Sequence, residues 1–408
     1  MDDRRSGASR VDASDVERWR SRIAADLWGS VVPFWMEHSL DREHGGYLNN
    51  LDRDGTCFDT RKHVWLQGRQ VWMLARMFNG NGDGSLLDAA RLGAEFLDRH
   101  AFRDDGRAYF SLTREGLPAG LQRKPFSECF CALAFAEYAR ATGDERFRAR
   151  ALETFRTVLR VARDPAALGR PVLAGEPATS SLAIPMILLN LTAELRGEPG
   201  SDTFDDWDGF DALEEDCVRG IALHFDHERG VVRETVAPDG ARIDAPEGRL
   251  LNPGHAIEAA WFLLQYAERR RDGRLVDEAV RMLTVSLEAG WDEQHGGILY
   301  FLDADGFSPT QLEWSMKLWW PHCEAMIATL YAWRLTVDDR WWAWFDRVAG
   351  WTYDHFPDAE HGEWFGYLDR EGRVSQRFKG GPYKGFFHVP RALMTCVGLL
   401  TDGPLADR

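Results

Sequence analysis

The sequence predicts an all-α protein, an (α/α)6 barrel of six helical pairs with short β-hairpins at one mouth. The first reason is a regular spacing of prolines that suit helix starts: they are separated by 60, 68, 68 and 69 residues, at Pro125, Pro185, Pro253, Pro321 and Pro390. Each is followed by an apolar segment with helical periodicity. The second reason is that glycine-turn hairpin signals recur at a similar interval, as expected for one repeated structural unit.

Six apolar segments form the predicted inner ring. The first, KHVWLQGRQVWMLARMF, begins at residue 62 and resembles the others without having the proline. The others are FSECFCALAFAEYA, MILLNLTAEL, GHAIEAAWFLLQYA, HCEAMIATLYAW and RALMTCVGLL. More amphipathic stretches alternate with them and supply the outer ring. These stretches span residues 14–38, 85–100, 144–162, 205–224, 274–290 and 338–355.

The hairpin signals support the same count. They are GGYLNNLDRDG, GRAYFSLTREG, GVVRETVAPDG, GGILYFLDADG and GEWFGYLDREG, and they begin at residues 45, 106, 230, 296 and 362. The interval between the signals at residues 106 and 230 is about twice as long as the others, because RPVLAGEP replaces the hairpin at the third helical pair. An open α-solenoid is the alternative, but its exposed concave face does not suit helices this apolar. In a closed ring the inner helices run parallel, so their N-termini and the hairpins surround one mouth.

Composition limits the class of protein. We expect a flexible N-terminus at residues 1–13, one barrel domain at 14–402 and a C-terminal tail at 403–408, because no linker divides the chain. The net charge of −16 argues against nucleic acid or an anionic membrane as partner. With no apolar run of membrane-spanning length and no secretory signal in the polar N-terminus, we expect a cytoplasmic protein. The six cysteines lack zinc spacing and are expected to be free, mostly buried thiols.

The stretch NPGHAIEAAWFLL carries the first functional signal. Asn252 can cap a helix and Pro253 suits its first turn. His255 and Glu258 then share one face near the helix N-terminus. The helix dipole disfavours a protonated histidine there, which suits a general base. A hydrogen-bonded histidine that only closes the helix end is the alternative.

The other inner-helix starts bring further polar and aromatic residues to the same mouth. No single start is decisive, but several in register predict one pocket that is rich in histidines, carboxylates, arginines and tryptophans. These residues are Lys62, Trp65, Gln67, Arg69, Glu128, Ser180, Ser181, His255, Glu258, Trp319, Trp320, His322, Glu324, Lys384, His388 and Arg391.

Several chemistries fit this set less well than proton transfer. The glycine-rich NGNGDGS follows a helix, so it is not expected to cradle a phosphate. A metal site would need preorganised ligands, and no HxH or HExxH pair supplies them. Glu258 and Glu324 would permit glycoside hydrolysis, although histidines at the central places disfavour it. Paired histidines suit removal of a proton from one face of a carbon and delivery to the other face. An arginine would then stabilise the enolate oxygen.

At these residues the sequence resembles the N-acylglucosamine 2-epimerase family, whose mammalian members are also described as renin-binding proteins. The similar blocks run through most of the chain in the family's order. They are KHVWLQGRQVWM, PFSECF, PVLAGEPATSSLAIPMILLNL, NPGHAIEAAWFLL, SPTQLEWSMKLWWPHCEAMIA, GEWFGYLDREG and KGGPYKGFFHVPR.

The resemblance implies an (α/α)6 barrel, usually a homodimer, that interconverts N-acetyl-D-glucosamine and N-acetyl-D-mannosamine in amino sugar metabolism, where the latter is a sialic acid precursor. It places the essential histidines at His255 and His388, and supporting residues at Arg69, Glu324 and Arg391. Residues of the same blocks receive orienting or binding roles, namely Glu258, Lys317, Trp320, His322 and Gln67. The family requires no metal or other cofactor, and ATP activates many members. The resemblance does not indicate which histidine acts on which epimer.

One departure is Phe386, which stands where mammalian members carry a cysteine. If the chain is active, its chemistry does not require that thiol. Three other functions remain open on the sequence: an aldose-ketose isomerase, a 2-epimerase of unsubstituted sugars such as mannose or cellobiose, and a non-catalytic protein of the renin-binding type.

Overall fold

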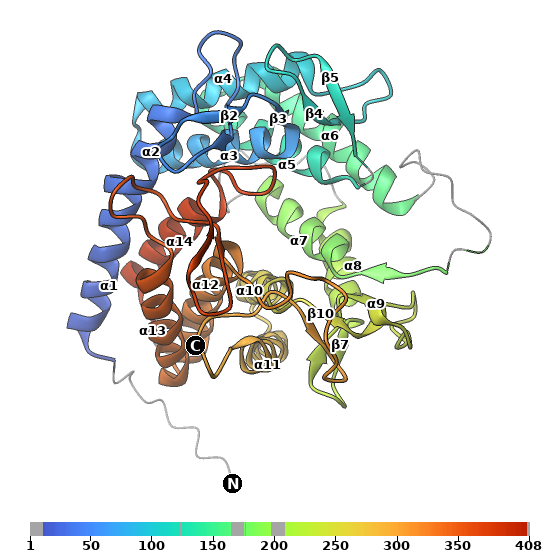
Figure 1. Ribbon diagram of the computed structural model, residues 1–408. Helices are drawn as coiled ribbons and strands as arrows, with labels where there is room; N and C mark the ends of the chain where they lie inside the picture. Colours follow the sequence, from blue (N-terminus) through green and yellow to red (C-terminus); the bar gives the residue numbers. More distant parts are fainter. Residues whose placement is uncertain (1–10, 123, 165–174, 176, 197–208, 406–408) are drawn as a thin grey trace.

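The inner ring consists of six helices that follow one another around the centre of the molecule (Figure 1). In this computed structural model the described residues are 11–122, 124–164, 175, 177–196 and 209–405. The inner helices are α3 (Val64–Asn81), α5 (Phe126–Thr142), α7 (Ala183–Arg196), α10 (Pro253–Arg270), α12 (Trp319–Thr336) and α14 (His388–Asp402). The ring closes where Phe387, just before α14, packs on Trp72 of α3 with ring centroids 5.5 Å apart. The predicted (α/α)6 barrel is therefore confirmed.

An outer layer covers these helices, and each outer helix packs on the inner helix next to it in the chain. Its members are α4 (Gly84–His100), α6 (Glu145–Arg163), α8 (Phe210–Ala222), α11 (Gly273–Gly290) and α13 (Asp339–His355). The sixth outer position is filled by the N-terminal helices, which lie beside the C-terminal α14 (Figure 1). They are α1 (Ala13–Asp26), the π-helix η1 (Leu27–Val31) and α2 (Val32–His38).

The predicted helix at 14–38 is thus interrupted by a π-helical turn. This turn ends two residues before Pro33, which has no N–H to continue the α-helical hydrogen bonds. The barrel domain is predicted over residues 14–402; the first described helix, α1, begins at Ala13, and the last, α14, ends at Asp402. Residues 1–10, residues 406–408 and almost all of RPVLAGEP lie outside the described part of the chain.

A short turn joins most inner helices to their outer partners. At four of these turns the inner helix ends in a left-handed residue and the following aspartate caps the outer helix. The pairs are Gly82 with Asp83, Gly143 with Asp144, Arg271 with Asp272, and Val337 with Asp338. This tight turn makes neighbouring helices antiparallel, so all described inner helices run in the same direction.

The strands are short and gather at the N-terminal end of the inner helices. All five hairpin signals end in DG or EG and turn on a left-handed glycine: Gly55, Gly116, Gly240, Gly306 and Gly372 have φ of +86°, +97°, +85°, +82° and +86°. The strands are β1 (Asn50–Leu51), β2 (Cys57–Asp59), β3 (Lys62–His63), β4 (Tyr109–Leu112), β5 (Pro118–Leu121), β6 (Ser180–Ser181), β7 (Phe225–Asp226), β8 (Val231–Val232), β9 (Thr235–Val236), β10 (Leu250–Leu251), β11 (Leu302–Asp303), β12 (Lys317–Leu318), β13 (Tyr367–Leu368) and β14 (Val374–Gln376).

Four lead-in strands stand directly before inner helices, and each pairs with the hairpin of the next repeat. The pairs are β3 with β4, β6 with β9, β10 with β11, and β12 with β13, all antiparallel. A four-residue helix, α9 (Pro246–Arg249), was not predicted and lies just before β10. These pairings fix where the four inner helices α3, α7, α10 and α12 begin, and therefore where their first side chains point.

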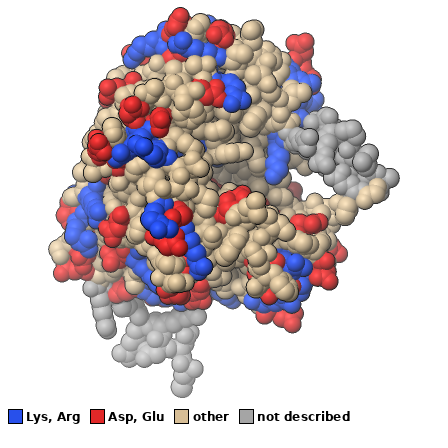
Figure 2. Space-filling model, in the orientation of Figure 1, with Lys and Arg blue, Asp and Glu red and all other residues tan. Residues whose placement is uncertain are grey.

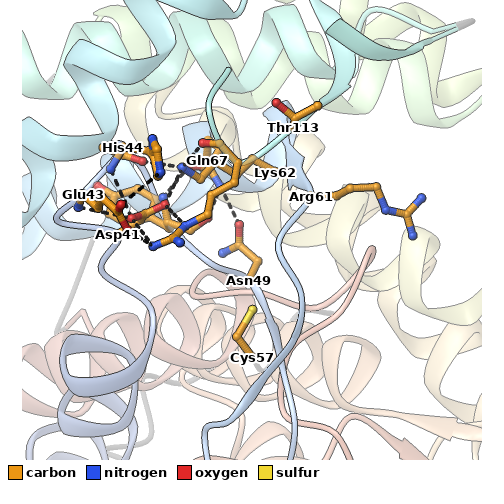
Figure 3. A network of polar contacts seen from close by, with 12 residues as sticks. Asp41, Glu43, His44, Asn49, Cys57, Arg61, Lys62, Gln67 and Thr113 are labelled. Atoms are coloured by element: carbon orange, nitrogen blue, oxygen red, sulfur yellow. Dashed lines mark hydrogen bonds and ion pairs between the residues drawn. The ribbon is translucent and has the colours of Figure 1, made fainter. Parts of the chain in front are cut away.

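Three ion triads of the same construction brace the hairpin loops. In each, a buried aspartate accepts hydrogen bonds from a buried lysine and from an arginine of a neighbouring hairpin. We call them the hairpin triads: Asp41 with Lys62 and Arg114, Asp292 with Lys317 and Arg370, and Asp358 with Lys379 and Arg53. Although burial opposes ionisation, the cationic partners hold the pKa of all three aspartates below the ordinary value. Figure 3 shows the first triad's Asp41 and Lys62 within one polar network.

All six cysteines are free, and all but Cys57 are buried, as predicted. In the described part of the chain, no helix combines the length and apolar character that crossing a membrane requires. Acidic and basic side chains are interspersed over the face drawn in Figure 2, so it carries no extended basic surface.

Candidate active site

The start of α10 is built as the sequence predicts. The Asn252 side chain accepts a hydrogen bond from the backbone N–H of His255 at 3.2 Å, and Pro253 is the first helical residue. Gly254 is required by packing: a Cβ atom there would lie 2.5 Å from the Trp320 ring. The close approach brings the ring centroids of His255 and Trp320 to 5.2 Å. The NPGH motif therefore sets a histidine against an indole.

His388, the first residue of α14, lies against the same indole, with ring centroids 5.9 Å apart. Its Nδ1 is 2.8 Å from Glu324 Oε1. Since a carboxylate only accepts hydrogen bonds, this contact places the proton on Nδ1 and leaves Nε2 with a free lone pair. Burial, followed by the charges of Arg69 and Arg391, holds the pKa of His388 well below its ordinary value. His388 is thus a neutral imidazole with an available base nitrogen.

Arg391 joins the two carboxylates of this region. Its Nη2 donates to Glu258 Oε1 at 2.9 Å and to Glu324 Oε1 at 2.6 Å. Trp261 Nε1 donates to the other oxygen of Glu324 at 2.9 Å. Against burial, these two carboxylates raise the pKa of the guanidinium. Arg391 is therefore a buried cation that holds the carboxylate of Glu324 in place beside His388.

Three side chains here offer ligand atoms within 4.8 Å of one another, namely Glu258, Glu324 and His388. Such a cluster of oxygens and nitrogen could hold a metal ion. The guanidinium of Arg391 already neutralises both carboxylates, and Glu324 also engages Nδ1 of His388. A metal ion would have to compete with those contacts.

His255 has a different environment from His388. Its Nδ1 is 2.9 Å from Glu234 Oε2, and its side chain is 28% exposed, against 10% for His388. Burial lowers its pKa, but Glu234 and then Glu258 more than offset that effect, so the pKa of His255 is raised. The helix dipole alone would lower the pKa of His255, but the effect of Glu234 is opposite and larger, because its carboxylate is in direct contact with the ring.

Arg69 is buried in an aromatic cage. Its guanidinium lies 4.5, 4.1 and 4.8 Å from the ring centroids of Trp65, Phe130 and Phe387. Gly68 allows this because a Cβ there would lie 2.5 Å from the carbonyl oxygen of Phe130. Burial lowers the pKa of Arg69 to about 9. Within the described residues no carboxylate forms an ion pair with it, and its Nε has no hydrogen-bond partner. Its charge is therefore available to an oxyanion.

Within the described part of the chain, three of the predicted binding residues form no hydrogen bond, ion pair or ring contact with the histidine pair and its partners. Lys317 belongs to a hairpin triad, 3.2 Å from Asp292. His322 uses both ring nitrogens internally, Nδ1 toward Leu318 O and Nε2 toward Ile298 N, and burial lowers its pKa to about 3. Gln67 bonds the backbone of Tyr47 at both ends of its amide and also Asn49 (Figure 3). All three are fully buried and engaged in contacts within the protein.

Other predicted mouth residues are also engaged in buried or internal contacts. Lys62, Glu128 and Lys384 form ion pairs with Asp41, Arg107 and Glu363. Ser180 Oγ lies 3.3 Å from Nε2 of His224. Phe386 packs near Trp35, with ring centroids 6.1 Å apart, so an apolar ring fills the position of the mammalian cysteine.

Sequence reasoning missed Glu234 and Trp261. Glu234 lies in the hairpin GVVRETVAPDG, for which the sequence predicts only a turn. A carboxylate in a mouth hairpin was a usable signal, but nothing in one sequence pairs it with His255. Trp261 is one of 17 tryptophans and stands in a buried helical stretch, where a core role is the ordinary expectation.

Together these residues can transfer protons. His388 offers a lone pair, Glu234 raises the pKa of His255 and so favours its protonated form, and both rings lie against Trp320. Arg69 supplies a buried positive charge for an oxyanion. This combination suits the conversion of a carbon acid through an enolate.

Comparison with known proteins is consistent with that chemistry. The profile of the family described as N-acylglucosamine 2-epimerase (GlcNAc 2-epimerase) matches residues 46–392. A mouse (Mus musculus) protein named N-acylglucosamine 2-epimerase is 46% identical over 400 residues, covering 96% of this chain and 94% of the mouse chain. The human protein (Homo sapiens) of that name is 45% identical and covers 96% and 92% of the two chains.

The fold is shared more widely. The structure of cellobiose 2-epimerase from Spirochaeta thermophila superposes with a TM-score of 0.80 at 22% identity, covering 95% of this chain and 98% of the other. At that identity the likeness concerns the fold alone. The profile match and the identity to the mouse and human proteins extend over nearly the whole chain, and on these grounds the protein belongs to the N-acylglucosamine 2-epimerase family.

Proposed function

We propose that this protein interconverts N-acetyl-D-glucosamine and N-acetyl-D-mannosamine by moving the proton at C2. The observation that carries the proposal is the pair of histidines against one indole, one neutral and one inclined to be cationic. The substrate is taken from the names of the mouse and human relatives, which are 46% and 45% identical to this chain.

The reaction begins with the open-chain aldehyde, whose carbonyl makes the C2 proton acidic. Nε2 of His388 takes that proton, and the electron pair of the broken C–H bond forms the enolate. Arg69 stabilises the charge on the enolate oxygen. Protonated His255 then gives its proton to the opposite face of C2, which restores the aldehyde with inverted configuration. One proton leaves His255 and one arrives on His388, so the charges balance.

The surrounding residues hold these groups in place. Glu324 fixes the tautomer of His388, and Arg391 with Trp261 fixes Glu324. Glu258 places a second negative charge near His255. Trp320 offers an apolar face to the carbon chain of the sugar. None of these steps needs a metal ion or another cofactor.

The proposal includes the partner of the protein, its location, its oligomeric state and its activator. The partner is a small amino sugar, and neither nucleic acid nor a membrane is part of the activity. Net charge of −16 supports that restriction. We also propose a cytoplasmic homodimer for which ATP is an allosteric activator, on the family resemblance alone.

An NMR time course with N-acetyl-D-glucosamine, with and without ATP, tests the function. We expect N-acetyl-D-mannosamine to accumulate until equilibrium is reached. ATP, as an allosteric activator, should make this accumulation faster. Parallel incubations with glucose and cellobiose test the need for the acetamido group. A ketose product would instead identify an aldose-ketose isomerase. Absence of turnover with every sugar would favour a binding protein.

A further inference from the structure

Glu234 is held firmly although it lies in a loop between two strands. Its backbone N–H donates to Leu250 O, in the strand before α10, and its carbonyl accepts from Leu182 N, just before α7. The preceding residue, Arg233, anchors the same hairpin through its bonds to Asp226 and to the carbonyl of Gly248. The Glu234 side chain, 15% exposed, thus leaves a fixed backbone and reaches His255.

The two histidine–carboxylate pairs differ in how the negative charge is shared. Glu324 is in contact with Arg391 as well as with His388, so an arginine competes for its charge. Within the described residues no lysine or arginine forms an ion pair with Glu234, so its charge faces His255. The cations Arg69 and Arg391 also lie near His388.

We propose that Glu234 is a positioning residue that holds His255 in its protonated form, so that the resting enzyme carries one acid, His255, and one base, His388. This rests on the proposed epimerase function for its catalytic meaning, but the protonation states exist without substrate. The resting enzyme is then prepared for the epimer whose C2–H faces His388. After each turnover the protons must return to this distribution by exchange with solvent before the same direction can proceed again.

Every charged or titratable group that faces His255 enters this balance. Glu234 comes from the hairpin, Glu258 from the same helix as His255, and Lys124 from the segment before α5. His388 faces it from α14. Lys124 opposes the cation, whereas Glu258 supports it but is already paired with Arg391. Direct contact makes Glu234 the dominant partner.

Titration of the histidine ring carbons by NMR tests the proposal directly on the full-length protein without substrate. Glu234→Gln keeps the size and the acceptor oxygen but removes the charge, so the pKa of His255 should fall by about one to three pH units. His388 should keep its neutral form. Glu228→Gln, at an exposed residue of the turn between β7 and β8, is the matched control and should leave His255 unchanged. Glu234→Asp retains the charge and should recover at least part of the shift.

The pH profile of kcat/KM gives the catalytic readout. In the direction that uses His255 as acid, Glu234→Gln should move the alkaline limb to lower pH by the same amount and leave the acidic limb in place. A residue with only a packing role would lower kcat at every pH without moving either limb. An unchanged His255 pKa in folded Glu234→Gln would overturn the proposal. Absence of any epimerisation would overturn the proposed function instead and leave the NMR result to stand.

Discussion

The side chains around the histidine pair and the hairpin triads are both rich in buried charge, but the two groups use it differently. In each hairpin triad the lysine donates to an aspartate and to backbone carbonyls, as Lys62 does to Asp41, Gly45 and Arg114. Around the histidine pair, by contrast, some polar groups have no partner. Arg69 has no carboxylate partner among the described residues, and Nε2 of His388 keeps a free lone pair.

This difference separates structural from catalytic residues of the same type. A fully satisfied buried ion group stabilises one conformation and has nothing to offer a substrate. An incompletely satisfied one costs stability and is retained where it acts on a ligand. The same criterion distinguishes His322, whose two nitrogens are both used, from His388, which keeps one free.

The largest expected effect is on kcat, through the histidine pair. His388→Ala removes the base nitrogen, so kcat should fall by about 10²–10⁴-fold. The melting temperature should change little in comparison with the variants of the triads. Stopped assays of epimerisation with circular dichroism melting check both. An active His388→Ala enzyme would exclude His388 as a base.

Arg69→Met should lower kcat by about 10²–10³-fold, because the enolate loses its buried positive charge. Methionine fills the aromatic cage, which keeps the packing near Trp65 and Phe130. Arg61→Met is the control, since that side chain is 61% exposed. Equal rates for the two variants would show that Arg69 does not stabilise the transition state.

The hairpin triads should respond in the opposite way. Lys317→Met leaves Asp292 short of its buried partner and should cost about 3–5 kcal/mol in the free energy of unfolding. Arg373→Met, an exposed ion pair in a neighbouring hairpin, should cost about 0–1 kcal/mol. Urea unfolding measures both. A tenfold loss of kcat/KM in well-folded Lys317→Met would instead place that lysine in the site.

His322 should make stability depend on pH. Its folded pKa of about 3 lies below the unfolded value of about 6.5, so the contribution is complete above pH 6.5 and is lost as the pH falls toward 3. In that window one proton is bound on unfolding, which costs about 1.4 kcal/mol for every pH unit. Urea unfolding from pH 7 to pH 4.5 should show a shallower slope in His322→Gln. An unchanged slope would mean that His322 is not buried neutral.

Phe386→Cys should have the smallest effect. The ring lies near Trp35 and makes no contact with the histidine pair, so kcat should remain within about twofold, although the cavity left by the ring should cost about 1–3 kcal/mol in stability. Rate and melting measurements separate the two effects. A large gain or loss of kcat would connect this position with the chemistry.

The architecture could be predicted from the sequence because it repeats. Proline spacing located the inner helices, and the glycines of the hairpins, such as Gly55 and Gly372, took the left-handed turn that the pattern indicates. The interrupted helix at Leu27–Val31 could not be derived, since a π-turn shifts hydrogen bonds without a clear sequence pattern.

The site was only partly predictable for a physical reason. His255 and His388 follow from helix starts, but a helix start cannot reveal whether a polar side chain points to the pocket or into a hairpin triad. Lys317 and Gln67 turn toward neighbouring loops, and their partners are distant in the chain. The charge state of His255 depends on Glu234, 21 residues away, so it required the fold.

Deuterium incorporation tests the central claim most directly. Wild-type protein is incubated with N-acetyl-D-glucosamine in D2O, and the hydrogen at C2 of the product is followed by NMR. Two-histidine transfer predicts that the product acquires deuterium at C2, because the proton taken by one histidine is not the one returned by the other. N-acetyl-D-mannosamine that retains the original hydrogen at C2 would contradict the mechanism.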